Sequence, residues 1–242
     1  MLKFNVIVWA LVFFTFSGLA TGKVLFIDDF EKDEIGKEPS NWEHLNFASG
    51  NSTITIEKDP QNPQNKVAKT EGIGLYIPKV AERENWSDYI WDFDWMWEND
   101  SYVGTIYRVE DAEAHFHGSR RQGATDMKIY TRKAGTWAEI ASGQYPNENN
   151  VWYSHRLIMK GKRHEIYMKE RDDETPFEQL KPVVEVENDM FKKGPVGMMG
   201  ITAGVSYFDN MVVVETIEDF KRLQAVDHHR KLTAIWGRIK NR

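Results

Sequence analysis

Cysteine is absent from this 242-residue chain. Disulfide bonds, thiolate metal sites, cysteine nucleophiles and a lipid anchor on an N-terminal cysteine are therefore all excluded. A folded domain of this sequence must be stabilised by burial of its core, with or without a bound cation. The apolar share of 41% and the aromatic share of 13% are sufficient for such a core.

An excess of positive charge is lacking too. Lys and Arg total 31 against 37 Asp and Glu, which gives a net charge of -6. Basic residues gather only in isolated pairs such as Arg120-Arg121 and Lys192-Lys193. The electrostatic footprint of a nucleic-acid-binding protein is missing, so we expect no nucleic-acid partner. The sequence also has no Gly-x-Ser-x-Gly nucleophile motif and no phosphate-binding glycine loop.

Residues 1–22 differ in composition from the rest of the chain. Lys3 precedes a mostly apolar run over 6–16, and Gly18, Ala20 and Gly22 supply the small residues that a signal peptidase needs. The run is too short to span a hydrocarbon core of about 30 Å comfortably. We predict a cleaved signal peptide over 1–22, with an uncleaved N-terminal anchor as the alternative. The mature protein is then secreted or periplasmic and has no membrane span.

Period-two alternation dominates residues 23–215 and predicts an all-β sandwich of two antiparallel sheets. The clearest segment is 89–97, where five aromatic side chains fall on one face and Asp92 and Asp94 on the other. The aromatic face is most simply a core face, although such rings also stack on sugars. The acidic face is most simply solvated, with a carboxylate cluster in a cleft as the alternative. Gly161-Lys162 predicts a tight hairpin between two further strands.

The tail over 216–242 has a different pattern. Thr216 and Asp219 have the spacing of a helix-capping pair, and apolar residues then recur at helical spacing. We predict one or two short amphipathic helices that pack on the sandwich or, alternatively, on a protein partner.

Several short segments, taken in order, resemble bacterial concanavalin A-like lectin/glucanase domains, with laminin-G-like and 3-keto-disaccharide hydrolase-like (DUF1080-type) domains the most similar in style. The segments are FIDDFE at 26–31, NDSYVG at 99–104, WY at 152–153, GPVG at 194–197 and FDN at 208–210. The resemblance spans about residues 24–215 and implies a concanavalin A-like jelly roll. It also implies that the first strand, with Asp28 and Asp29, pairs with the last strand, with Asp209.

Members of this superfamily bind glycans, cleave them or mediate adhesion, and the fold alone does not decide among these activities. Family 16 glycoside hydrolases carry E-x-D-x-x-E or E-x-D-x-E on one strand, and none of the strands predicted here carries either string. We therefore expect a non-catalytic carbohydrate-binding or adhesion module. The alternative is a glycoside hydrolase, 3-keto-disaccharide hydrolase-like or family 16-like, that acts through Glu113, His115 and His117 with Asp92 or Asp94. A third possibility is an interaction module that docks through its C-terminal helices.

Candidate glycan-contacting residues combine aromatic rings with polar groups. Glu113, His115 and His117 alternate onto one strand face, which could line a polar groove or, less simply, hold a metal ion. The full candidate set is Tyr102, Tyr107, Glu113, His115, His117, Arg121 and Trp137.

A structural calcium ion is the cofactor we consider. Jelly-roll carbohydrate modules often share a calcium between their first and last strands, and calcium prefers carboxylate and carbonyl oxygens. The residues that match this resemblance are Asp28, Asp29, Glu31 and Asp209.

Overall fold

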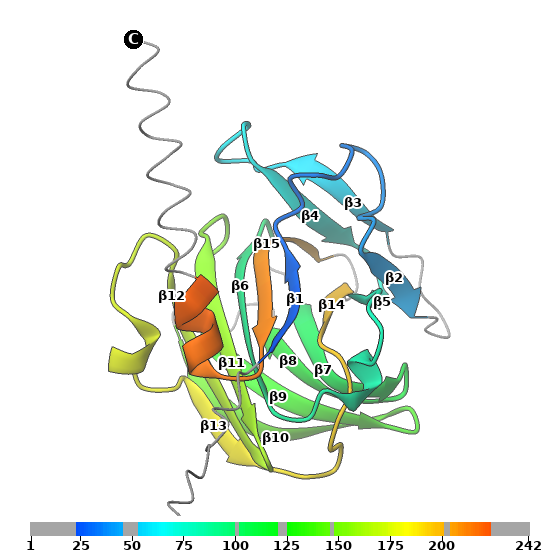
Figure 1. Cartoon of the computed structure of the whole chain (residues 1–242), viewed down its shortest axis with the longest axis vertical. Coiled ribbons are helices and arrows are strands. Elements are labelled where there is room, and N and C mark those ends of the chain that lie inside the picture. Colours follow the sequence, from blue (N-terminus) through cyan, green and yellow to red (C-terminus); the bar gives the residue numbers. More distant parts are fainter. Residues whose placement is uncertain are drawn as a thin grey trace, which may run out of the picture.

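The computed structural model describes residues 23–45, 53–99, 102–120, 125–145, 148–200 and 204–223. These residues form two antiparallel sheets packed face to face, as Figure 1 shows, so the predicted β-sandwich is confirmed. The predicted signal peptide and most of the predicted helical tail lie outside the described residues and stay predictions.

One sheet has eight strands, in the order β13-β12-β11-β6-β15-β4-β3 with β1 paired to β15, and the other has seven, in the order β10-β9-β8-β7-β14-β5-β2. The short β2 is the one strand that the alternation did not predict. The strands are β1 Val24–Asp28, β2 Trp42–Leu45, β3 Thr53–Lys58, β4 Lys66–Glu71, β5 Gly74–Pro78, β6 Tyr89–Trp97, β7 Val103–Asp111, β8 Ala114–Arg120, β9 Asp126–Lys133, β10 Thr136–Gln144, β11 Tyr153–Lys160, β12 Arg163–Glu170, β13 Val184–Glu187, β14 Gly197–Gly200 and β15 Val205–Val214.

Strand β6 supplies the centre of the core between the two sheets. Its aromatic side chains point inward, and the Trp95 ring stacks on Phe208 of β15 with centroids 5.7 Å apart. The Trp97 ring stacks in the same way on Tyr153 of β11, at 5.1 Å. Stacked rings bury large apolar areas in fixed geometry, which fixes β6 against both of its neighbours. The aromatic face is a core face, as the simpler interpretation of the sequence predicted.

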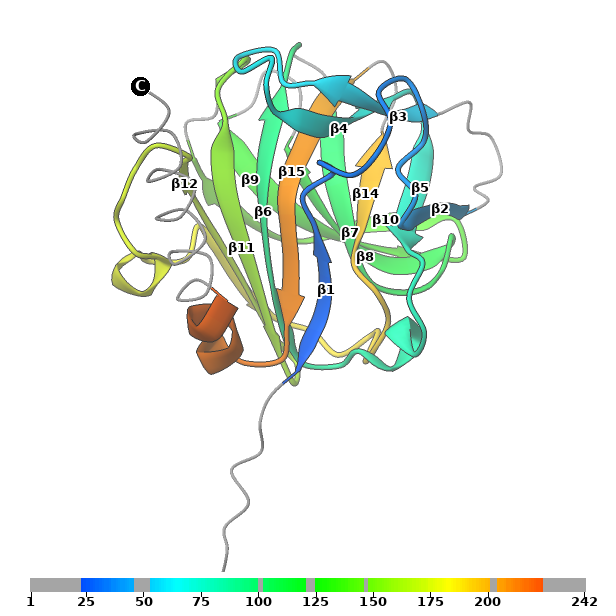
Figure 2. The ribbon, with the colours of Figure 1, turned by 45° about the horizontal axis from the view of Figure 1, so that its top comes forward.

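The first and last strands lie side by side, as Figure 2 shows for the blue β1 and the orange β15. Asp28 faces Met211 in this antiparallel pair, which confirms the predicted closure of the sandwich. The register of β15 against β6 shifts after Asp209, where Asn210 adopts a left-handed φ of 51°. Such a bulge turns the following side chain out of the pleat, and Asn210 thereby reaches the outer face of the sheet.

The acidic face of β6 is buried rather than solvated, which corrects the simpler prediction. Asp92 and Asp94 are only 8% and 9% exposed. Arg156 of β11 donates from Nε and Nη2 to the two carboxylate oxygens of Asp92, at 2.7 and 2.8 Å. Asp94 accepts from Ser154 Oγ and Asn210 Nδ2, at 2.7 and 2.8 Å. Paired and hydrogen-bonded in this way, two carboxylates can be held out of water.

Two aromatic residues that are distant from β6 in the sequence cover the face of the sheet that carries Asp92 and Asp94. The Arg156 guanidinium lies 4.6 Å from the ring centroid of Phe177 and 4.5 Å from that of Phe220. Phe220 belongs to the short helix at 217–223, which lies beside the sheet in Figure 1. The predicted capping pair is present, because Thr216 Oγ1 donates to Asp219 Oδ2 at 2.6 Å and accepts from the Asp219 amide. Within the described residues, no helix has the length and apolar character needed to cross a membrane.

Replacing Trp95 by Ala should lower the free energy of unfolding by about 3–5 kcal/mol, because the substitution removes a fully buried indole and leaves a cavity. Ile27→Ala, at a position 47% exposed on β1, should change it by less than about 1 kcal/mol. Denaturant unfolding followed by circular dichroism measures both values. Equal losses in the two variants would contradict the central place of β6 in the core.

Asp209 should make the stability pH-dependent. Burial raises the pKa of its carboxyl to about 7, although hydrogen bonds from Asn65 and Asn210 act in the opposite direction. Between about pH 4 and pH 7 the folded chain then binds a proton that the unfolded chain releases, so the free energy of unfolding falls as the pH rises through this window. Asp209→Asn should flatten the slope, whereas the exposed Asp29→Asn should retain it. Unfolding curves across the pH range would contradict this assignment if Asp209→Asn kept the wild-type slope.

Candidate functional site

The candidate site lies on the outer face of the seven-stranded sheet, where strand register brings distant residues into two rows. One row runs across three strands as Trp137, Arg132 and His115. The next row contains Glu139, Tyr130, His117 and Ile106. Residues opposite one another in adjacent antiparallel strands point to the same face, so these side chains form one continuous patch.

Trp137 lies near the surface of this patch, close to the turn between β9 and β10. The residue is 39% exposed and is the one exposed tryptophan, tyrosine or phenylalanine among the described residues. Its ring centroid lies 5.1 Å from that of His117 and 5.8 Å from that of His115. The Arg132 guanidinium lies 4.6 Å from the indole centroid. The indole is therefore fixed from several sides while part of it faces solvent.

The two imidazoles lie below the surface. His115 and His117 are 0% and 4% exposed. A Cβ added to Gly104 would come within 2.1 Å of His117 Nε2, so the absence of a side chain at Gly104 gives the imidazole its place against the β7 backbone. Among the described residues, neither ring nitrogen of His117 has a hydrogen-bond partner, and the same holds for Nε2 of His115. These rings support Trp137 rather than present themselves to solvent.

Burial keeps both histidines uncharged. Desolvation, with smaller contributions from His115 and Arg132, lowers the pKa of His117 to about 3. Desolvation likewise lowers the pKa of His115 to about 4, against a hydrogen bond with the Asp111 carbonyl. At neutral pH the layer beneath Trp137 therefore carries no charge on its imidazoles.

Two ion pairs lie on the same sheet face as the indole. Glu113 Oε2 lies 2.6 Å from Nη2 of Arg132 and accepts a 2.9 Å hydrogen bond from its Nε. In the second pair Glu139 Oε2 lies 2.7 Å from Nζ of Lys128 and accepts from the Tyr130 hydroxyl at 3.4 Å. The exposed part of the patch thus combines one aromatic ring with two carboxylates whose positions are fixed by cations.

The structure brings together four of the candidate residues, namely Glu113, His115, His117 and Trp137. Tyr107 is not among them, because it points into the core, stacks on Phe116 and lies 3.1 Å from His164 Nδ1 through its hydroxyl. Tyr102 precedes β7 at the end remote from His115. Arg121 lies outside the described residues.

Sequence reasoning missed four members of the patch: Lys128, Tyr130, Arg132 and Glu139. Alternation within 126–133 and 136–140 would have placed Lys128, Tyr130 and Arg132 on one face and Trp137 and Glu139 on another. No pattern in the sequence fixes how these two faces and that of His115 align, since the alignment depends on strand register.

The four carboxylates considered for calcium are each occupied with protein donors. Asp28 accepts from the Trp42 indole at 2.9 Å and from the Phe30 amide at 3.0 Å. Asp29 accepts from the Glu31 amide, and Glu31 from the Lys66 amide. Asp209 accepts from the Asn65 side chain at 2.8 Å and from the Asn210 amide at 2.7 Å. In the described ranges, no group of three or more His, Asp or Glu side chains is arranged to hold a metal ion.

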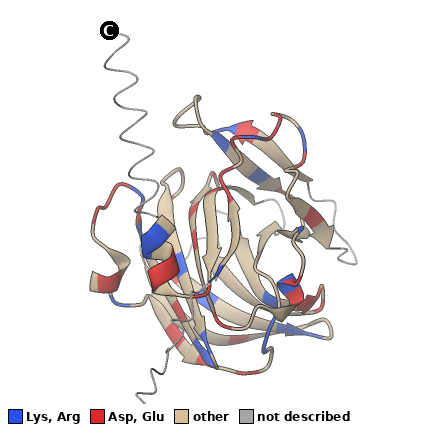
Figure 3. Cartoon of the chain, viewed as in Figure 1, with Lys and Arg blue, Asp and Glu red and all other residues tan. Residues whose placement is uncertain are grey.

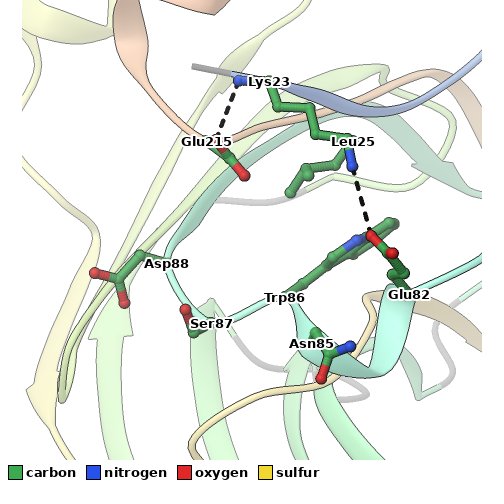
Figure 4. A pocket seen from close by; sticks show the side chains of 8 residues that line it. All are labelled: Lys23, Leu25, Glu82, Asn85, Trp86, Ser87, Asp88 and Glu215. Carbon is green, nitrogen blue, oxygen red and sulfur yellow. Dashed lines mark hydrogen bonds and ion pairs between the residues drawn. The ribbon is translucent and has the colours of Figure 1, made fainter. Parts of the chain in front are cut away.

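A separate surface pocket of about 130 Å³ lies where β1 begins, beside the turn that leads into β6 (Figure 4). Its floor is Trp86, and Lys23 lies at its rim. The charged groups of the pocket pair with one another, because Lys23 contacts Glu82 through Nζ and Glu215 through its amide. Asp88 lies 3.5 Å from the buried Arg108 guanidinium. Because these groups are already paired, the pocket offers a ligand fewer polar contacts than the patch around Trp137, Glu113 and Glu139, called the Trp137 patch below.

No protein-family model and no curated protein matches the sequence. Solved structures do match. A carbohydrate-binding module, CBM66, from Bacillus subtilis is 16% identical over 72% of this chain and 94% of the module, with a TM-score of 0.53. A protein of unknown function with a galectin-like fold, also from Bacillus subtilis, is 12% identical over 79% of this chain and 97% of that chain, with a TM-score of 0.54.

A xylan β-1,4-xylosidase from Bacillus halodurans is 14% identical over 77% of this chain, with a TM-score of 0.54. The similar region makes up only 38% of the xylosidase. At these identities the likeness concerns the fold, not the activity. Two antiparallel sheets with this strand order and these structural neighbours show that the chain has the concanavalin A-like jelly-roll fold.

Proposed function

We propose that this protein is an exported glycan-binding module that binds through the outer face of the seven-stranded sheet. The observation that carries the proposal is the exposed Trp137 indole, which shares one sheet face with the carboxylates of Glu113 and Glu139. Sugar rings present C–H faces that stack on an indole and hydroxyl groups that donate to carboxylates. The patch offers both kinds of contact within a few residues.

Preorganisation supports the same conclusion. Trp137 packs against His115, His117 and Arg132, so little side-chain freedom is lost when a ligand covers it. The carboxylates are likewise fixed, Glu113 by Arg132 and Glu139 by Lys128. A protein with the same fold, the Bacillus subtilis carbohydrate-binding module, adds support.

Binding without catalysis fits the described carboxylates better than hydrolysis does. A hydrolase that used Asp92 or Asp94 together with Glu113 and His115 would need them to converge in one cleft. Asp92 and Asp94 instead lie on the outer face of the other sheet, buried against Arg156, Ser154 and Asn210. Glu113 and Glu139 are each engaged with a cation. The carboxylates of the patch therefore serve as hydrogen-bond acceptors in this proposal.

Trp137→Ala should weaken retention on a glycan ligand by roughly tenfold or more, because it removes the stacking surface. Affinity electrophoresis of the mature protein through gels containing a panel of polysaccharides first identifies a ligand and then measures the change. Met190→Ala, which removes an exposed apolar side chain elsewhere, is the matched control and should leave retention unchanged. Failure of wild type to be retained by any glycan would count against the proposal, as would full retention of Trp137→Ala.

Gly104→Ala tests the support beneath the indole without altering Trp137. The new Cβ overlaps His117 Nε2, so the imidazole must move and the indole above it loses its support. Retention should fall. Gly118→Ala on the adjacent β8 is the control, because its Cβ points away from the patch and approaches Thr105 Oγ1 at 3.0 Å. Both variants should lose thermal stability, and equal retention by the two would show that the position of His117 does not matter for binding.

A further inference from the structure

The two ion pairs of the Trp137 patch are alike in which partner is exposed to solvent. In each pair the cation is the more buried partner: the side chains of Arg132 and Lys128 are 11% and 13% exposed. Their carboxylate partners Glu113 and Glu139 are 38% and 40% exposed. A ligand that approaches the indole therefore meets the carboxylates first, while the cations lie beneath them.

Two further ion pairs of this sheet follow the same pattern. Lys128 has a second carboxylate, Asp126, at 3.5 Å. At the far side of the sheet Arg83 is paired with Glu43 of β2, and the arginine is again the less exposed partner. His115 and His117 add no positive charge, since burial lowers the pKa of each well below neutral pH. Over the described part of this face, each cation named here is already neutralised by at least one acid.

Figure 3 shows Lys and Arg interspersed with Asp and Glu along the ribbon. A protein that captures uronic or sulfated glycans needs exposed cations, because desolvating an anion requires a compensating positive charge. The Trp137 patch has its cations beneath a layer of carboxylates instead.

From this layering we infer that the Trp137 patch selects uncharged glycans and rejects anionic ones, with Glu113 and Glu139 as the residues that determine the selectivity. The inference rests on the proposed function, since it concerns the ligand class of the same site. Neutral hydroxyl groups can donate to the exposed carboxylates, whereas carboxylate or sulfate groups on a glycan meet like charge at the same positions. The selectivity thus comes as much from repulsion as from attraction.

Matched pairs of polymers test the wild-type protein. Affinity electrophoresis would compare dextran with dextran sulfate and methyl-esterified with de-esterified pectin, within the panel of neutral polysaccharides that identifies a ligand. We expect retention by neutral polymers and at least roughly tenfold weaker retention by any anionic counterpart at low salt, where charge repulsion is least screened. Stronger retention by the anionic member of a pair would overturn the inference.

Removing one carboxylate should reverse the discrimination. Glu139→Gln leaves Lys128 with the more distant Asp126, and Glu113→Gln removes the Glu113 carboxylate from Arg132. Each variant should gain retention on the anionic polymers, and the gain should disappear in about 0.5 M salt. Glu185→Gln is the matched control, because Glu185 is an exposed carboxylate paired with Arg163 on the other sheet. It changes the net charge equally and should gain nothing.

The outcomes separate the two proposals. Wild-type protein that no polymer retains contradicts glycan binding itself. Retention of neutral and anionic polymers alike contradicts only the charge selectivity. If Glu139→Gln is unfolded by circular dichroism, Glu113→Gln provides the same test on the other ion pair. Folded variants that gain no anionic retention would show that the carboxylates do not determine the selectivity.

Discussion

The rest of this structure depends on the burial of β6 on both of its faces. All nine residues of Tyr89–Trp97 are buried, although the strand alternates between aromatic and acidic side chains. The aromatic face can be buried by simple apolar packing, but the acidic face cannot, because a carboxylate out of water must be paired. Arg156, Ser154 and Asn210 supply that pairing from the two strands beside β6.

This constraint propagates through the eight-stranded sheet. Arg156 can neutralise Asp92 only while β11 keeps its register against β6, in which the two residues face each other. Asn210 can reach Asp94 only because the β15 bulge turns it outward. A slip of one residue in either pairing would leave a carboxylate buried without a partner, at a cost of several kcal/mol. Polar groups on the outer face therefore specify the register that apolar packing alone would leave less certain.

Local alternation was sufficient to predict the strands, but not the environment of their outer faces. The segment 89–97 and the hairpin at Gly161 follow from residues that are neighbours in sequence. The burial of Asp92 depends on Phe177 and Phe220, which pack on its partner Arg156 from far along the chain. The four-residue strand β2 is too short for a period to be recognised. Sequence periodicity therefore predicts neither very short strands nor the burial of an outer face by residues that are distant in the sequence.

The site was predictable to the extent that it depends on one strand. His115 and His117 share a face by alternation alone, and Trp137 was identified as an aromatic candidate. Tyr107 does not lie beside them, because it pairs with Phe116 of β8, whose parity is opposite to that of the histidines. The sequence of β7 alone does not show which of its two faces points into the core. Arg132 and Glu139 could not be assigned to the patch without the pairing of three strands.

Unpaired buried nitrogens do not by themselves mark a functional site in this fold. His155 has two such nitrogens and lies between aromatic rings in the core, with its ring centroid 4.4 Å from that of Phe93. An unsatisfied buried polar group costs about 1–3 kcal/mol wherever it occurs, so both histidine environments are equally in need of an explanation. The difference lies in what covers them. His155 is enclosed by the core of the sandwich, whereas His117 lies beneath an indole that faces solvent. Only the second arrangement can transmit a change in the imidazole to a bound ligand, and this makes Trp137, rather than the histidines, the residue on which the site depends.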